Sequence, residues 1–153
     1  MASIEEGLRQ IAELGAADNW LAVLVTQRES GDPAPTVVNA GLVKHPLTGE
    51  QAVAFVSRGN TLKLRNLRRD PRATLVFRAG WEWTAVAGPV ELIGPDDELP
   101  GFPAEQLPQL IREIYAAAGG THPDPAEFDR VMAADRRTVA LVTPERFTVN
   151  VRG

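Results

Sequence analysis

Hydrophobic positions near the start of the chain recur with the period of a helix. They are Ile4, Leu8, Ile11 and Leu14. This spacing places them on one face of a helix. Ser3 and Glu6, at the beginning of the segment, have the spacing of a capping box. The pattern predicts a helix over residues 3–16 that packs through one face.

Three runs of apolar and β-branched residues follow, and each predicts a strand. They cover Trp20–Gln27, Thr36–Lys44 and Gln51–Ser57. Segments rich in Gly, Pro and Asp separate them at 29–34 and 45–50. Connections this short predict an antiparallel meander of three strands.

After the third strand, Asn60 or Thr61 can cap a short helix that Asp70-Pro71 ends after Arg69. The pattern farther along the chain predicts strands at 72–78 and 82–93, joined tightly at Ala79-Gly80, a loop at 95–103, and helices at 104–117 and 125–134.

The last apolar segments, 138–142 and 146–151, predict a final strand interrupted at Pro144. About six short strands with helices between them are typical of a mainly β protein, an antiparallel barrel with appended helices. No linker divides the chain, so we expect one domain over residues 1–153.

Composition narrows the functional classes. Apolar residues make up 44% and charged residues 24% of the chain, as in soluble globular proteins. The absence of cysteine excludes disulfides, thiolate metal sites and cysteine nucleophiles. The apolar runs are too short to span a membrane, and the acidic amphipathic N-terminus is unlike a signal peptide. We expect a soluble, cytoplasmic protein without a membrane partner.

Positive charge gathers between Ser57 and Arg72, although the whole chain has a net charge of −4. The helix spacing divides this segment into two sets. The first set lies at the helix entrance and comprises Ser57, Arg58, Thr61, Lys63 and Asn66. Hydroxyl, amide and cationic groups beside a helix N-terminus suit a phosphate.

The second set shares another side of the helix and comprises Arg65, Arg68, Arg69 and Arg72. It could meet a second acidic group or water, and a solvated surface helix also explains its spacing. Nucleic acid is disfavoured as a partner because no aromatic residue interrupts the basic run and the rest of the chain is acidic.

Trp81 and Trp83 alternate along a strand and so point to the same face. They could stack on a planar ligand, fill a dimer interface or pack in the core.

His45 and His122 are far apart in the sequence and lack ligand spacing, which disfavours a metal site. No nucleophile elbow or glycine-rich phosphate loop occurs. If the protein is an enzyme, a cofactor should carry its chemistry.

Three segments carry a family resemblance: PTVVNAGLV, QAVAFVSRGNTLKLRNLRRDPRATLVF and WEWTAVAGPVEL. They resemble the pyridoxamine-5′-phosphate-oxidase-like split barrels, and most closely the actinobacterial branch that binds the deazaflavin coenzyme F420. The closing segment, from Gly119 to Asn150, is similar to that branch too. The run K-x-x-N-L-R-x-D-P-R at Lys63–Arg72 is the most specific piece.

The resemblance implies a six-stranded split β-barrel that forms a homodimer with cofactor sites between the subunits. It assigns the cofactor phosphate to the set at the helix entrance. The backbone of Val38, Asn39 and Gly41 would run along the ring system, where a glycine permits close approach. Trp81 and Trp83 would reach across from the partner subunit.

The activity that the resemblance implies is F420-dependent hydride transfer to an unsaturated organic acceptor, with no catalytic side chain assigned. The second arginine set becomes a candidate for the acidic tail of F420, a charge that FMN lacks. An FMN-dependent oxidoreductase of the same fold and a non-catalytic F420-binding carrier remain the alternatives.

Overall fold

Six antiparallel strands close into a barrel in the computed structural model, which describes residues 3–150. The strands of this part of the chain are β1 (Leu21–Gln27), β2 (Pro33–Lys44), β3 (Gln51–Ser57), β4 (Arg72–Ala79), β5 (Glu82–Ile93), β6 (Thr138–Val142) and β7 (Arg146–Val149). Around the barrel they run β1-β2-β3-β6-β5-β4, and β4 pairs with β1 to close the ring. The predicted mainly β split barrel and the three-strand meander are confirmed.

The predicted interruption at Pro144 is confirmed, and it divides the last segment into β6 and β7. β6 pairs with β3 and with the second half of β5, whereas β7 pairs with the first half of β5. Both lie along the same edge of β5, because the Thr143 and Glu145 N–H groups between them donate to the Pro89 and Ala87 carbonyls. Gly88 permits this close passage, since a Cβ there would lie 1.8 Å from the carbonyl oxygen of Thr143. The predicted end at Val151 lies outside the described residues.

β2 begins earlier than expected, at Pro33 instead of Thr36. Its first half, to Asn39, pairs with β1, and its second half, from Ala40, pairs with β3. The first half has a partner strand on one side only. Prolines 33 and 35 are compatible with such an edge. A proline has no backbone N–H group to donate, and on the open side no partner strand is there to receive a hydrogen bond.

Two hydrophobic clusters make the core. The larger fills the barrel with residues such as Leu24, Phe55, Phe77 and Phe147. Helix α1 (Ile4–Ala17) adds Ile11 to it. The Ser3 hydroxyl accepts a hydrogen bond from the Glu6 N–H, so the predicted N-terminal cap is confirmed.

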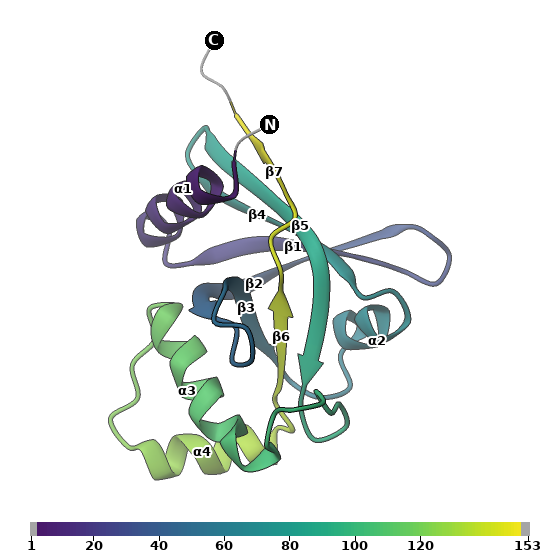
Figure 1. Ribbon diagram of the computed structural model, residues 1–153, viewed down its shortest axis with the longest axis vertical. Helices are drawn as coiled ribbons and strands as arrows, with labels where there is room; N and C mark the ends of the chain where they lie inside the picture. The colour runs from purple at the N-terminus through teal and green to yellow at the C-terminus, as the bar shows by residue number, and fades with distance from the viewer. Residues whose placement is uncertain (1–2, 151–153) are drawn as a thin grey trace.

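The second cluster lies outside the barrel, where α3 covers β2 and β3 (Figure 1). α3 spans Leu107–Ala117 after a 3₁₀ turn at Ala104–Gln106, and α2 spans Leu62–Arg69. α4 (Pro125–Ala134) has no buried residue and packs through the half-buried Phe128 and Met132. Within residues 3–150, no helix is long and apolar enough to cross a membrane.

Candidate functional site

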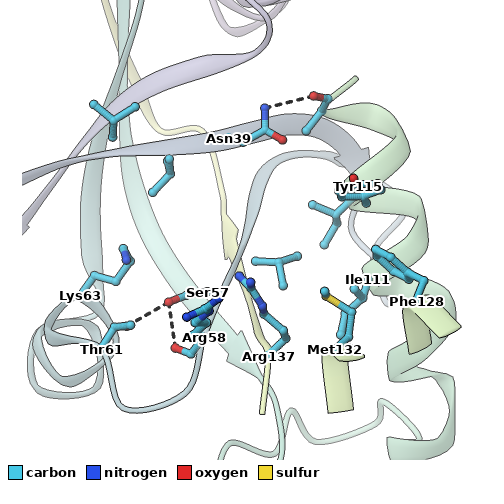
Figure 2. A pocket seen from close by; sticks show the side chains of 15 residues that line it. Asn39, Ser57, Arg58, Thr61, Lys63, Ile111, Tyr115, Phe128, Met132 and Arg137 are labelled. Atoms are coloured by element: carbon cyan, nitrogen blue, oxygen red, sulfur yellow. Dashed lines mark hydrogen bonds between the residues drawn. The ribbon is translucent and has the colours of Figure 1, made fainter. Parts of the chain in front are cut away.

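A cleft of about 400 Å³ lies between the barrel and the α3–α4 pair. We call it the barrel–helix cleft. Its cationic end is made by Ser57, Arg58, Thr61, Lys63 and Arg137. Its apolar end is made by Ile111, Ile114, Tyr115, Phe128 and Met132. Figure 2 shows the two ends facing each other, with Arg137 as the member of the cationic end that lies toward the apolar end.

The hydroxyl groups of the cationic end come from the junction of β3 and α2. Ser57 ends β3, and its Oγ donates to the Arg58 carbonyl at 3.0 Å and lies 2.9 Å from the Thr61 Oγ1. Thr61 is the N-cap of α2, as predicted, but its side chain makes no capping hydrogen bond. The Thr61 hydroxyl is turned toward the cleft side, which leaves N–H groups of the first turn without a side-chain cap.

Lys63 supplies an ammonium group that makes no ion pair or hydrogen bond with any residue from 3 to 150. Burial lowers the pKa of this ammonium below its ordinary value, and the nearby positive charge of Arg137 lowers it further. Both causes disfavour the charged form of Lys63. An anion beside the ammonium would offset them, because an opposite charge stabilises the charged form.

The two arginines of the cationic end share one carboxylate. Arg58 Nε lies 3.8 Å from Asp135 Oδ2, and Arg137 Nη2 lies 3.5 Å from the same atom. The Arg137 Nε is buried and has no hydrogen-bond partner. Three cations therefore face one carboxylate, and the cationic end keeps a positive surplus.

Sequence reasoning did not identify Arg137. It stands 74 positions after Lys63, in the turn between α4 and β6, and only the pairing of β6 with β3 brings it to the cleft. The dipeptide Arg136-Arg137 between a helix and a strand was the only sequence signal.

Three rings meet at the apolar end. The His122 ring stacks on Phe128 with centroids 4.7 Å apart, and Tyr115 lies 4.9 Å from Phe128. His122 belongs to the α3–α4 connection, and its Nδ1 is buried without a hydrogen-bond partner. The Tyr115 side chain is half-buried. Of the three, Tyr115 and Phe128 line the cleft, and they form an apolar wall suited to a planar group.

Val38 and Asn39 line the cleft from β2, and their expected part in binding a cofactor stays a prediction. The Asn39 amide donates to the Ala118 carbonyl at 3.1 Å and to the Asn19 carbonyl at 3.0 Å. It therefore fixes the end of α3 against the barrel (Figure 2).

The reason expected for Gly41 needs correction. A Cβ at Gly41 would lie 2.7 Å from the Ala117 carbonyl carbon and 2.8 Å from the Ala118 nitrogen. The close approach that this glycine permits is that of the α3 backbone. Gly41 shapes the cleft from behind and does not line it.

Asn66 also lies elsewhere than expected. It is 1% exposed, and its amide donates to the Thr26 hydroxyl at 3.1 Å while its carbonyl oxygen accepts from Arg69 at 3.2 Å. The bond to Thr26 ties α2 to β1. The structure therefore places Asn66 outside the cleft, on the buried side of the helix that also carries Lys63.

The two tryptophans do not reach the cleft within one chain. Trp81 is 92% exposed in the turn between β4 and β5. Trp83 lines a different hollow, beside Arg9 and Glu13 of α1. Their expected contribution across a subunit boundary stays a prediction.

The second arginine set does not form an open basic face. Arg68 makes two hydrogen bonds to Asp97, at 2.9 and 2.7 Å, and Arg72 makes one to Glu145 at 2.8 Å. Both acids raise the pKa of their arginine through these bonds. Arg72 belongs to β4 and not to α2. The remaining members, Arg65 and Arg69, donate to backbone carbonyls.

Hydrogen bonds hold the His45 ring in the turn after β2. His45 Nε2 lies 2.8 Å from Glu91 Oε1, and its Nδ1 accepts from the Leu47 N–H, so it closes the β2–β3 turn. No group of three potential ligand side chains occurs within residues 3–150.

Comparison with known protein families identifies one that matches most of this sequence. The sequence model of the pyridoxamine 5′-phosphate oxidase family matches residues 10–150. This range covers the whole barrel, the cleft and the helices α2 to α4.

Solved structures share the fold at low identity. A protein of unknown function from Agrobacterium tumefaciens is 18% identical with a TM-score of 0.66; the match covers 97% of this chain but 57% of that protein. An F420 reductase is 16% identical with a TM-score of 0.58, covering 86% and 91%. An FMN-binding relative of pyridoxamine 5′-phosphate oxidase from Nostoc punctiforme is 17% identical with a TM-score of 0.59, covering 96% and 84%.

At these identities the likeness shows the fold alone. Heme-binding and heme-storage proteins from Mycobacterium smegmatis and Vibrio cholerae share it as well. The choice of cofactor must therefore be argued from the cleft.

Proposed function

Because this chain belongs to the pyridoxamine 5′-phosphate oxidase family, we propose that it binds a flavin-type cofactor in the barrel–helix cleft and acts as an oxidoreductase. The cofactor in this proposal is F420, and the hydride acceptor is an unsaturated organic compound. The observation that carries the proposal is the ammonium of Lys63, which no other side chain from residues 3–150 neutralises, beside the hydroxyls of Ser57 and Thr61.

The chemistry of the cleft fits such a group at both ends. A phosphate would accept hydrogen bonds from the hydroxyls and the ammonium, and its charge would offset the surplus of the cationic end. The rings of Tyr115 and Phe128 offer apolar surface to a planar system. A volume of about 400 Å³ is in the range of small-molecule sites.

When bound, the deazaflavin supplies a hydride for an electron-poor double bond. The residues of this chain have positioning roles. Lys63, Ser57 and Thr61 hold the phosphate, Asn39 fixes the end of α3, and the apolar wall keeps water from the ring.

The two candidate cofactors are supported by different observations. F420 is supported by the resemblance of the sequence to the F420-binding branch, which extends to the closing segment from Gly119 to Asn150; the fold matches to an F420 reductase and to an FMN-binding protein do not separate the two cofactors. FMN is favoured by the pairing of Arg68 with Asp97 and of Arg72 with Glu145, because these bonds occupy the arginines expected to receive an acidic tail. FMN is therefore the second candidate.

A homodimer belongs to the same proposal. Leu21, Val23 and Val37 form an exposed apolar strip on β1 and β2, and Val37 also lines the cleft. A second copy covering this strip would remove apolar surface from water and narrow the cleft.

The decisive experiment is a titration of the purified protein with F420 and with FMN, followed by fluorescence and calorimetry. We expect saturable binding of both, with the lower Kd for F420. Tighter FMN binding, or copurification with FMN, would replace the first candidate by the second. Binding of F420 without turnover across a panel of unsaturated acceptors would leave the carrier alternative.

A further inference from the structure

The turn between α4 and β6 brings two oppositely charged side chains to the cationic end of the cleft. Asp135 is the C-cap of α4, and its carbonyl accepts a hydrogen bond from the Gly59 N–H at 3.1 Å. This bond fixes the turn to the segment that leads into α2. Arg136 pairs with Asp96 at 2.6 Å, on the side of the turn away from the cleft. Arg137 alone of the two arginines lines the cleft.

The contacts of Arg137 are incomplete. Its side chain is 24% exposed, its Nε is buried without a partner, and its single ion pair, to Asp135, spans 3.5 Å. That distance is longer than the 2.7–2.9 Å of a strong charge-assisted hydrogen bond. A planar guanidinium with unused donors beside a cleft is suited to an oxyanion.

Asp135 holds both arginines loosely. The same Oδ2 atom lies 3.5 Å from Arg137 and 3.8 Å from Arg58. A phosphate oxygen placed between Lys63 and Arg137 could make shorter bonds to the same donors. The carboxylate of Asp135 would then lose a partner, so it competes with the ligand for Arg137.

We propose that Arg137 is a ligand-binding residue that completes the anion site, and that Asp135 is its internal counter-ion, released when a phosphate-type group binds. This inference rests on the proposed function for the identity of the cofactor, but its chemistry requires only a phosphate group. It adds a residue from the far end of the chain to a site otherwise built at the β3–α2 junction. Asp135 sets the affinity of that site by competition.

The test uses four variants of the full chain. Arg137→Ala removes the cation, and Arg137→Lys keeps the charge but not the planar donor set. Asp135→Asn removes the competing charge while keeping the backbone bond to Gly59. Arg130→Ala is the matched control, because Arg130 is an exposed arginine on α4 that pairs with Glu127 and does not line the cleft. Each variant is titrated with F420, FMN and inorganic pyrophosphate.

We expect Arg137→Ala to raise the Kd of the bound phosphate ligands by about tenfold, as loss of a charge-assisted bond does. Arg137→Lys should recover part of this loss, and Arg130→Ala should stay within about twofold of the wild type. Asp135→Asn should lower the Kd by severalfold. The melting temperature without ligand separates these effects from a loss of folding.

The titrations distinguish a wrong role for Arg137 from a wrong cofactor. If the wild type binds a cofactor and Arg137→Ala binds it as well as Arg130→Ala does, Arg137 is no ligand-binding residue and the cofactor proposal stands. If neither cofactor binds but pyrophosphate binding depends on Arg137, the cofactor proposal fails and the anion site remains. An unchanged or raised Kd in Asp135→Asn would overturn the counter-ion role.

Discussion

Lys63 is the residue on which phosphate binding should depend most. Its ammonium faces the cleft without a carboxylate partner within residues 3–150, and its pKa is lowered by burial and by Arg137. We expect Lys63→Ala to weaken cofactor binding by about tenfold or more, since charge-assisted bonds are worth roughly 1.5–3 kcal/mol. Arg72→Ala is the control, because Arg72 pairs with Glu145 outside the cleft. Equal, small losses in both variants, measured by calorimetry, would contradict the role of Lys63.

The lowered pKa of Lys63 has a consequence for pH dependence. Arg58 and Arg137 also line the cationic end, and Lys63 is the cation there with a lowered pKa. Only the protonated form attracts a phosphate. Affinity should be constant below the lowered pKa and should fall as pH rises through it, earlier than for an exposed lysine.

In Lys63→Arg this alkaline loss should disappear, because a guanidinium stays protonated. Cofactor Kd values measured across the alkaline range in both proteins test the assignment. The same alkaline profile in Lys63→Arg as in the wild type would attribute the loss to another group.

Asn66 shows a limit of residue-level inference from spacing. Its helix position next to Lys63 predicted a site residue, but the structure buries it against Thr26. We expect Asn66→Ala to lower the free energy of unfolding by about 1–3 kcal/mol, because the Thr26 hydroxyl is left buried without this partner. Urea denaturation measures this loss. A loss of cofactor affinity with unchanged stability would restore the predicted role.

At the scale of elements, Gly88 lets the backbone between β6 and β7 pass close to β5. A Cβ there would meet the Thr143 backbone at 1.8 Å, where the chain passes from β6 to β7. We expect Gly88→Ala to lower stability by about 3 kcal/mol, the upper part of the usual overpacking range. Gly49→Ala serves as the comparison, since Gly49 has a φ of 74° but no atom within 4 Å of its Cβ position.

Gly49→Ala should therefore show only the cost of the left-handed backbone, about 1 kcal/mol. Thermal unfolding followed by circular dichroism compares the two variants. Equal destabilisation would mean that the backbone at Thr143 moves to accommodate a methyl group.

Most elements follow from local patterns, and the exceptions have physical causes. Helix α1 was predicted from apolar spacing and its cap, and the strands β3 and β5 from apolar runs between turn residues. The pairing of β6 with β3 and β5 was not predicted, because it joins distant parts of the chain. Pairing over long sequence distances leaves no local signal.

At the scale of the molecule, the exposed strip on β1 and β2 is where association should occur. We expect Val37→Glu to dissociate a homodimer, because Val37 is 63% exposed and an interfacial carboxylate would be desolvated. Val131→Glu on α4 is the control, as another exposed apolar residue outside the cleft. Sedimentation velocity measures the masses. A monomeric wild type would contradict the dimer proposal.

Only part of the candidate site could be predicted from the sequence. The part built at the β3–α2 junction, with Ser57 and Lys63, came from one continuous segment. The part built by α3, α4 and the turn that carries Arg137 requires the closed barrel, in which β6 lies beside β3. The first part can be predicted because its residues are neighbours in the sequence. The second part forms only when the barrel closes and brings distant residues together.

Helix α4 forms one wall of the cleft, and its weak packing should affect how tightly the cleft binds a ligand. None of its residues is buried, and Phe128 and Met132 contact both the second core cluster and the cleft. Such a helix should open locally at a lower free energy than the barrel strands. A ligand in the cleft would cover those two side chains and complete the packing of the helix. Hydrogen exchange of the α4 amides should therefore slow on binding more than that of β1, and the affinity of the cleft includes the cost of ordering this helix.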